Sequence, residues 1–186
     1  GGPFTVQRTS PGTALITSVV GNSVLAAGSI EVQGVAAGMQ QAILRCEEDG
    51  SEVLSETDVL LLPGGVIDLQ GPGTSGGALS LGRDLIDLAG DGFFQEQNST
   101  VRFEGNGPQV IITSGHPEVF HRLVVDKPGG DLTLDMPVEV SWELVLGRGR
   151  VNTTAAALLT LRSGAEATGG SDLAFVNGPM EKVGIT

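Results

Sequence analysis

The feature that most constrains this chain is a run of short apolar segments in its second half, separated by glycine-rich turns. Within these segments apolar and polar residues alternate: Leu132 and Leu134 fall on one face of an extended strand, and Thr133 and Asp135 fall on the other. Strand-length segments at a spacing of about ten residues are typical of an all-β chain. The expected strands of this half are Gln109–Thr113, Arg122–Asp126, Asp131–Asp135, Val138–Leu146 and Ala155–Leu161.

The first half carries similar but less regular segments. Expected strands include Phe4–Arg8, Ser29–Gln33, Val59–Leu62 and Ala78–Leu81. Gln40–Arg45 is a further expected strand, and the longer stretch Val35–Arg45 is alternatively compatible with a short helix, which Gly34 and Gly38 weaken. We therefore expect residues 1–100 to form a less regular β-rich cap or insertion and residues 101–186 a regular repeat region, with one continuous domain as the alternative.

Repeats of this kind predict stacked turns, so the expected fold is an all-β, right-handed β-helix-like solenoid of about eight or nine turns. A β-sandwich with the same strands is the alternative. The core must be aliphatic, because only 4% of the residues are aromatic and the chain has no tyrosine. Small, regular side chains of this kind suit stacked β-layers, in which each buried position repeats the environment of its neighbour.

The net charge of the chain limits the classes of molecule that it is expected to bind. The formal net charge is −12, and the only lysines are Lys127 and Lys182. Binding to nucleic acid requires clustered lysine and arginine, so we expect no nucleic-acid partner. We also expect no membrane insertion, because no apolar run approaches the roughly 18 residues that cross a bilayer. The single cysteine, Cys46, is expected to be a buried thiol in a strand.

Residues 120–183 resemble a pattern in large secreted and cell-surface β-solenoid proteins of Bacteroidota, many of them exported by type IX secretion. The match covers about one third of the chain, and it departs from the pattern at His121-Arg122 and Trp142. The resemblance implies an extracellular structural or adhesive module of a surface layer, fibre or filament, without enzymatic activity. Its positions are Phe120, Leu123, Val125, Gly130, Leu132, Val138, Val140, Leu144, Leu146, Gly149 and Phe175–Pro179.

Such a module would have copies of itself or other cell-surface proteins as partners. Its terminal strand, with Phe4, Val6 and Arg8, is a candidate for pairing with an open sheet edge of a neighbouring subunit. Pairing within the chain is the alternative. A polysaccharide-binding or polysaccharide-degrading β-helix domain is the second functional hypothesis, and Trp142 is its candidate glycan-binding residue.

Three patterns are candidate chemical sites. Asp84, Asp87 and Asp91 form the densest acidic segment and are the candidate ligands for calcium. His116, Glu118 and His121 offer zinc-type ligands but lack a fourth, which favours a surface turn around Pro117. Gly73–Gly77 spells the serine-hydrolase motif G-x-S-x-G around Ser75, but the strand-like sequence after it favours a glycine-rich turn.

Overall fold

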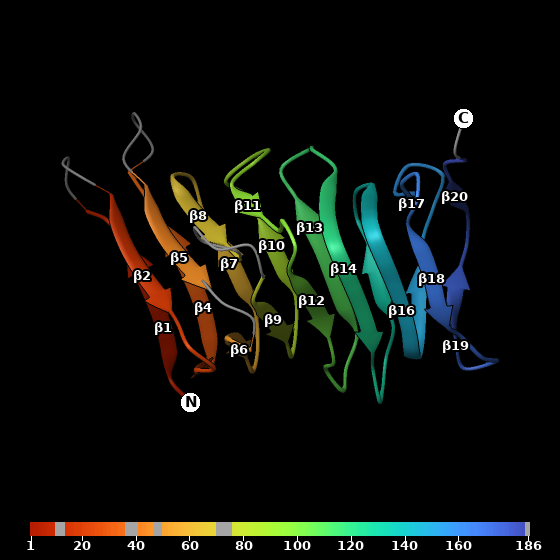
Figure 1. Ribbon diagram of the computed structural model, residues 1–186, viewed down its shortest axis with the longest axis horizontal. Coiled ribbons are helices and arrows are strands. Elements are labelled where there is room, and N and C mark those ends of the chain that lie inside the picture. The colour runs from red at the N-terminus through yellow and green to blue at the C-terminus, as the bar shows by residue number, and fades with distance from the viewer. Residues whose placement is uncertain (10–13, 36–40, 47–49, 70–75, 185–186) are drawn as a thin grey trace.

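The computed structural model describes residues 1–9, 14–35, 41–46, 50–69 and 76–184. These residues form twenty β-strands and no helix. None of the described segments is therefore a helix long and apolar enough to cross a membrane. The strands pair in parallel and stack into a β-solenoid of about seven turns, with β1 and β20 at opposite ends of its long axis (Figure 1).

The strands lie on three faces, of which the first and the third run along the whole stack and the second is a separate four-stranded sheet in the first four turns. The first face stacks strands in the order β1, β4, β7, β10, β13, β15, the end of β16, and β19. Their bounds are β1 Pro3–Gln7, β4 Ser29–Gln33, β7 Val59–Leu61, β10 Leu85–Asp87, β13 Gln109–Thr113, β15 Leu132–Leu134, β16 Val138–Asn152 and β19 Ala174–Asn177.

The second face begins with β2 Leu15–Val19, β5 Ala42–Cys46, β8 Gly65–Asp68 and β11 Phe94–Gln95. The third face stacks β3 Val24–Ala27, β6 Glu52–Ser55, β9 Ala78–Leu81, β12 Thr100–Phe103, β14 Glu118–Asp126, β16 and β18 Glu166–Gly169. The long strand β16 pairs in succession with β17 Leu159–Leu161, β18 and β19, and β17 pairs with β20 Met180–Lys182.

The core consists of in-register rows of aliphatic side chains. On the first face Ile30, Val59, Leu85, Ile111 and Leu134 follow one another from turn to turn, and all are buried. A row of Val53, Leu79, Val101, Leu123 and Leu144 does the same on the third face. Each full burial of such a side chain contributes about 1.5–3 kcal/mol. The core is mostly aliphatic, as predicted, and Phe94, Phe103 and Phe120 are buried in it as well.

The solenoid prediction is confirmed, and the β-sandwich alternative is excluded, because the named strands pair in parallel. Several turns are longer than the roughly 20 residues expected of one repeat: 26 residues separate Leu85 from its partner Ile111, and 29 separate Ile30 from Val59. There are therefore fewer turns than expected. The first and third faces run through residues 1–100 and 101–186, so both parts belong to one solenoid.

Most expected strands are present, and Ser29–Gln33, Ala78–Leu81 and Gln109–Thr113 match residue for residue. The expected helix at Val35–Arg45 is wrong where the structure describes it, because Ala42–Cys46 is strand β5. This strand pairs in register with β2 on one side and β8 on the other. Tertiary pairing decides the local conformation there.

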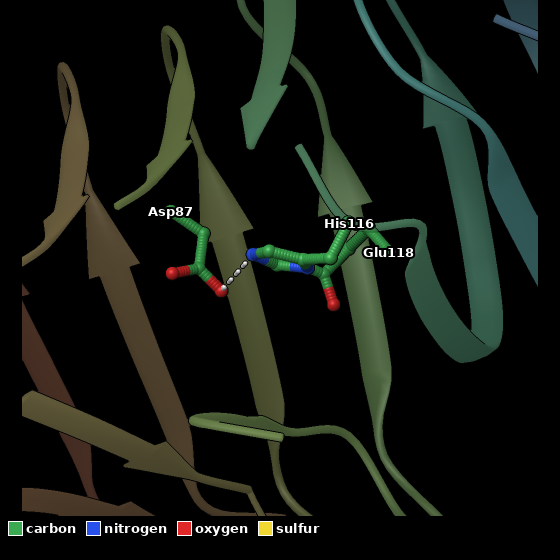
Figure 2. A group of neighbouring side chains, drawn as sticks. All are labelled: Asp87, His116 and Glu118. Carbon is green, nitrogen blue, oxygen red and sulfur yellow. Dashed lines mark ion pairs between the residues drawn. The ribbon is translucent and has the colours of Figure 1, made fainter. Parts of the chain in front are cut away.

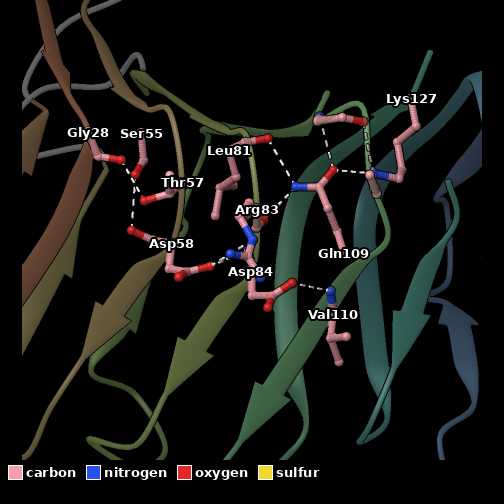
Figure 3. A network of polar contacts seen from close by, with 12 residues as sticks. Gly28, Ser55, Thr57, Asp58, Leu81, Arg83, Asp84, Gln109, Val110 and Lys127 are labelled. Carbon is pink, nitrogen blue, oxygen red and sulfur yellow. Dashed lines mark hydrogen bonds and ion pairs between the residues drawn. The ribbon is translucent and has the colours of Figure 1, made fainter. Parts of the chain in front are cut away.

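Polar side chains hold the corner that connects the third face to the first (Figure 3). The Asp58 carboxylate accepts a hydrogen bond from the Asp84 backbone N–H at 3.1 Å, and the Asp84 carboxylate accepts one from the Val110 N–H at 2.8 Å. In the turn before, the Thr57 hydroxyl donates to the Gly28 carbonyl at 2.6 Å. Each of these side chains ties one turn to a neighbouring turn.

A buried lysine extends this corner. The Lys127 ammonium donates to the Gly107 carbonyl at 2.8 Å, to the Gly105 carbonyl at 3.1 Å and to the Gln109 side-chain oxygen. The Gln109 amide donates in turn to the Leu81 carbonyl at 3.1 Å (Figure 3). Burial lowers the pKa of Lys127 to about 8. Three acceptors match the three donors of an ammonium group, which explains how this cation is accommodated inside the solenoid.

Candidate functional site

A charged residue interrupts one of the buried rows of the first face. Asp87, the last residue of β10, is paired in register with Leu61 of the preceding turn and Thr113 of the following turn. Its side chain is fully buried. An unpaired carboxylate in an aliphatic row is costly, so this position requires a compensating group.

His116 and Glu118 reach Asp87 from the next turn, where the chain passes from β13 into β14. The His116 Nε2 atom lies 4.0 Å from the Asp87 Oδ2 atom, and one ligand atom from each residue lies within 4.8 Å of the other two (Figure 2). The whole Glu118 residue is 4% exposed, and the His116 side chain is 12% exposed. We call these three residues the corner cluster.

Each member of the corner cluster has one atom engaged with the backbone. Asp87 Oδ1 accepts from the Ala89 N–H at 2.9 Å, and Glu118 Oε1 accepts from the Val119 N–H at 3.1 Å. His116 Nδ1 lies 3.2 Å from the Pro117 carbonyl oxygen. A carbonyl can only accept, so this contact assigns the proton to Nδ1 and leaves a lone pair on Nε2.

The second polar atom of each side chain has no hydrogen-bond partner: Asp87 Oδ2, Glu118 Oε2 and His116 Nε2 are all buried and unpaired. These are atoms of the three side chains that converge in Figure 2. Buried polar atoms are nearly always paired, so three unpaired atoms at one place indicate a binding site.

The pKa values of the two carboxyl groups in the corner cluster are also unusual. Burial, and next the charge of Asp87, raise the pKa of Glu118 to about 9. Burial also raises the pKa of Asp87, although the backbone N–H of Ala89 and the nearby His116 oppose this shift. In the described part of the chain no lysine or arginine forms an ion pair with either carboxylate. The two carboxyl groups thus form a buried acidic pair, and His116 is the basic side chain beside it.

The predicted calcium ligands do not form one site. Asp84 lies at the polar corner, where its carboxylate accepts from Val110, whereas Asp87 belongs to the corner cluster and Asp91 is exposed in the following loop. Asp84 precedes β10, which begins at Leu85, and the ligand-type neighbours of Asp87 are a histidine and a glutamate and not Asp84 or Asp91. Calcium binding itself stays a prediction.

The zinc motif of the sequence is divided in a similar way. His116 and Glu118 point into the corner cluster, but His121 stacks on Trp142 with ring centroids 5.1 Å apart. The expectation of a surface turn is wrong for Glu118, which is buried. The third ligand-type residue, Asp87, precedes His116 by 29 residues, about one turn. The signal that identifies it is a charged residue at the buried phase of an alternating strand.

Trp142 is the candidate glycan-binding residue and lies on the outer side of the third face. Its side chain is 51% exposed, with His121 stacked against the ring and the Arg122 guanidinium 6.0 Å from the ring centroid. Trp142, Glu143, Gly164 and Glu166 line a shallow pocket of about 280 Å³. An exposed aromatic ring with neighbouring carboxylates is therefore present on this face.

The terminal strand is paired within the chain on one side. Strand β1 pairs in parallel with β4, and the Arg8 N–H donates to the Gln33 carbonyl at 2.9 Å. Val6 is buried in the core, and Phe4 packs against it. The other edge of β1 is the end of the first face. Pairing of that edge with another subunit stays a prediction.

Two further sequence candidates have clear outcomes. Cys46 is buried in β5 as predicted, and burial is the main cause that raises the pKa of its thiol to about 11. Among the described acidic residues Glu52 adds to this shift. Ser75 of the hydrolase-like motif lies outside the described residues.

Comparison of the chain with protein-family models, with curated proteins and with solved structures finds no match. The resemblance of residues 120–183 to secreted bacterial solenoids therefore stays a prediction, as does its implied route of export.

Proposed function

We propose that this chain is a non-enzymatic structural module of an extracellular or cell-surface assembly, and that it associates end to end with copies of itself. The observation that carries this proposal is the distribution of exposed apolar side chains. Ten large hydrophobic residues are exposed in the described chain, and eight of them lie on the first and last turns. The eight are Leu15, Ile16, Val20, Val24, Leu173, Phe175, Met180 and Val183.

Such ends differ from those of a solenoid that is closed at its termini. Terminal repeats of soluble solenoids present a polar outer face, because an uncovered apolar turn promotes association. Here Val24 is 58% exposed on the first turn and Leu173 is 80% exposed on the last. Both end turns also carry strand edges with unpaired backbone groups, which favour pairing with another strand.

The two ends are compatible with each other. The strands are parallel throughout, so β19 of one copy and β1 of the next would have the same direction in a continued first face. Contact between two different ends is a heterologous arrangement, which produces filaments when it does not close into a ring. This supports a fibre or layer built by stacking, in which the terminal strand adds to its neighbour.

The test compares two substitutions of exposed leucines. Leu173→Lys places a charge at the last turn, and Leu88→Lys places the same charge on an exposed leucine in the middle of the solenoid. We expect the wild-type protein and Leu88→Lys to form oligomers or filaments in sedimentation velocity and negative-stain electron microscopy. Leu173→Lys should remain monomeric with an unchanged circular dichroism spectrum. A monomeric wild type at all concentrations, with and without calcium, would refute end-to-end association.

A second function is favoured by the surroundings of Trp142. Sugar rings stack on exposed aromatic faces and hydrogen-bond to nearby carboxylates, and Trp142 has Glu143 and Glu166 in the same pocket. A glycan array would test whether polysaccharides bind there. We expect binding by the wild type to be lost in Trp142→Ala and retained in Leu88→Ala. The absence of binding at millimolar glycan would exclude this function.

A further inference from the structure

We propose that Asp87, His116 and Glu118 bind one Zn²⁺ ion inside the solenoid and thereby link two consecutive turns. The proposal stands apart from the assembly of the module and from the glycan pocket. It rests on the three buried, unpaired ligand atoms that converge from β10 and from the β13–β14 corner.

The ligand atoms are oriented for a metal. Zinc binds imidazole nitrogen and carboxylate oxygen at about 2.0–2.2 Å, which places neighbouring ligand atoms of a tetrahedral site about 3.4 Å apart. Asp87 Oδ2 and His116 Nε2 are 4.0 Å apart, and one ligand atom from each of the three residues lies within 4.8 Å of the other two. Binding of zinc would require the side chains to move closer by less than about 1.5 Å. The backbone contact of His116 Nδ1 leaves Nε2 as the ligand atom, as in metal-bound histidines.

The donor set selects among cations. Calcium takes six to eight oxygen ligands and magnesium keeps most of its waters, so neither fits one imidazole and two carboxylates in a buried corner. Imidazole nitrogen favours zinc and its neighbours in the first transition series. A dication also neutralises the two carboxylates, which form no ion pair with a lysine or arginine in the described chain.

The fourth ligand would be water. Asp87 is fully buried and Glu118 nearly so, whereas the His116 side chain retains some exposure, so solvent and the ion reach the site along the imidazole. The simplest rival occupant is a proton shared by the two carboxyl groups. Burial raises the pKa of both groups, which makes that rival physically sound. The experiment must therefore separate the ion from the proton.

The first measurement is calorimetric titration of chelator-treated full-length chain with Zn²⁺. We expect one ion per chain, and we expect His116→Ala to weaken binding by at least about 100-fold, since even outer-shell partners cost 10–100-fold. His121→Ala is the matched control, because it removes the other histidine of the chain, on the outer face. Binding lost equally in both variants, or unchanged in His116→Ala, would overturn the proposal.

Glu118→Gln keeps the shape of the side chain and separates a lost ligand from a lost fold. At pH 8 without metal, this variant should melt at a higher temperature than the wild type, because a buried acidic group is removed. Added Zn²⁺ should raise the melting temperature of the wild type and of His121→Ala but not that of Glu118→Gln. Co²⁺ should give a tetrahedral visible spectrum in the wild type but not in His116→Ala. If Zn²⁺ does not change the melting temperature of the wild type and Co²⁺ gives no tetrahedral spectrum, zinc binding is refuted and the two carboxyl groups share a proton instead.

Discussion

The close approach of Gly34 to Gly64 allows one stability effect to be worked out in detail. Gly34 follows β4, and a Cβ atom added to it would lie 2.0 Å from the Gly64 carbonyl oxygen and 2.7 Å from the Gly64 Cα atom. Both are backbone atoms of the next turn, so no side chain can rotate away. The Gly64 carbonyl also accepts the hydrogen bond of the Ala42 N–H at 3.0 Å, at the start of β5.

Two destabilising contributions and one stabilising contribution determine how much Gly34→Ala changes the free energy of unfolding. Overpacking against a fixed backbone costs about 1–3 kcal/mol. Displacement of the Gly64 carbonyl weakens its bond to Ala42, which costs about 0.5–1.5 kcal/mol. Alanine also lowers the conformational entropy of the unfolded chain, which stabilises the folded protein by about 0.4–1 kcal/mol. We therefore expect a loss of about 0.5–4 kcal/mol in the free energy of unfolding.

Urea denaturation monitored by far-ultraviolet circular dichroism measures this loss, and Gly107→Ala is the control. A Cβ atom on Gly107 would meet nothing within 4 Å, and its φ angle is not positive. This control should be neutral or more stable by about 0.4–1 kcal/mol. If the two variants differ by less than about 1 kcal/mol in unfolding free energy, the turns are not held at the described spacing and the reasoning fails.

Three further predictions concern buried ionisable groups. In metal-free protein burial raises the pKa of Glu118 to about 9, above its ordinary value of 4.5. Its contribution to stability is therefore complete below pH 4.5 and is lost as the pH rises toward 9. The unfolding free energy measured as a function of pH should show this decline in the wild type and a smaller decline in Glu118→Gln. Lys127→Met leaves the Gly105 and Gly107 carbonyls unpaired and should lower the unfolding free energy by about 2 kcal/mol or more. The exposed control Lys182→Met should change it by less than about 0.5 kcal/mol. The Cys46 thiol should resist alkylation at pH 8 until the chain unfolds, since burial raises its pKa to about 11; labelling of the native protein at the rate of a free thiol would contradict this.

The parts of the fold that were predictable depend on local alternation. Leu132 and Leu134 are buried with Thr133 exposed between them, as the period of two requires. The number of turns was less accessible, because the connections vary: 19 residues separate Leu132 from Val151, but 29 separate Ile30 from Val59. A repeat of variable length hides the register that holds the turns together.

The corner cluster was only half predictable for the same reason. His116 and Glu118 are close in sequence, but their neighbour Asp87 is brought to them by the pairing of β10 with β13. Spacing along the chain suggested His121 in its place, and alternation along β14 places that residue outside, on Trp142. Lys127 gave no sequence signal, because the carbonyl groups that accept its hydrogen bonds belong to a turn of the backbone.

The polar corner of Figure 3 has a consequence for how the chain finds its register. Rows of valine, leucine and isoleucine are nearly interchangeable, so a growing ladder can stack a segment on the wrong predecessor with little loss of apolar contact. Asp58 fits only beside the Asp84 N–H, and Lys127 fits only where the Gly105 and Gly107 carbonyls converge. A misplaced turn would bury the Lys127 ammonium without its partners and would leave the Asp58 carboxylate without the Asp84 N–H. The polar corner thus specifies the register of the turns, because mispaired turns lose its hydrogen bonds, whereas the aliphatic rows supply most of the stability.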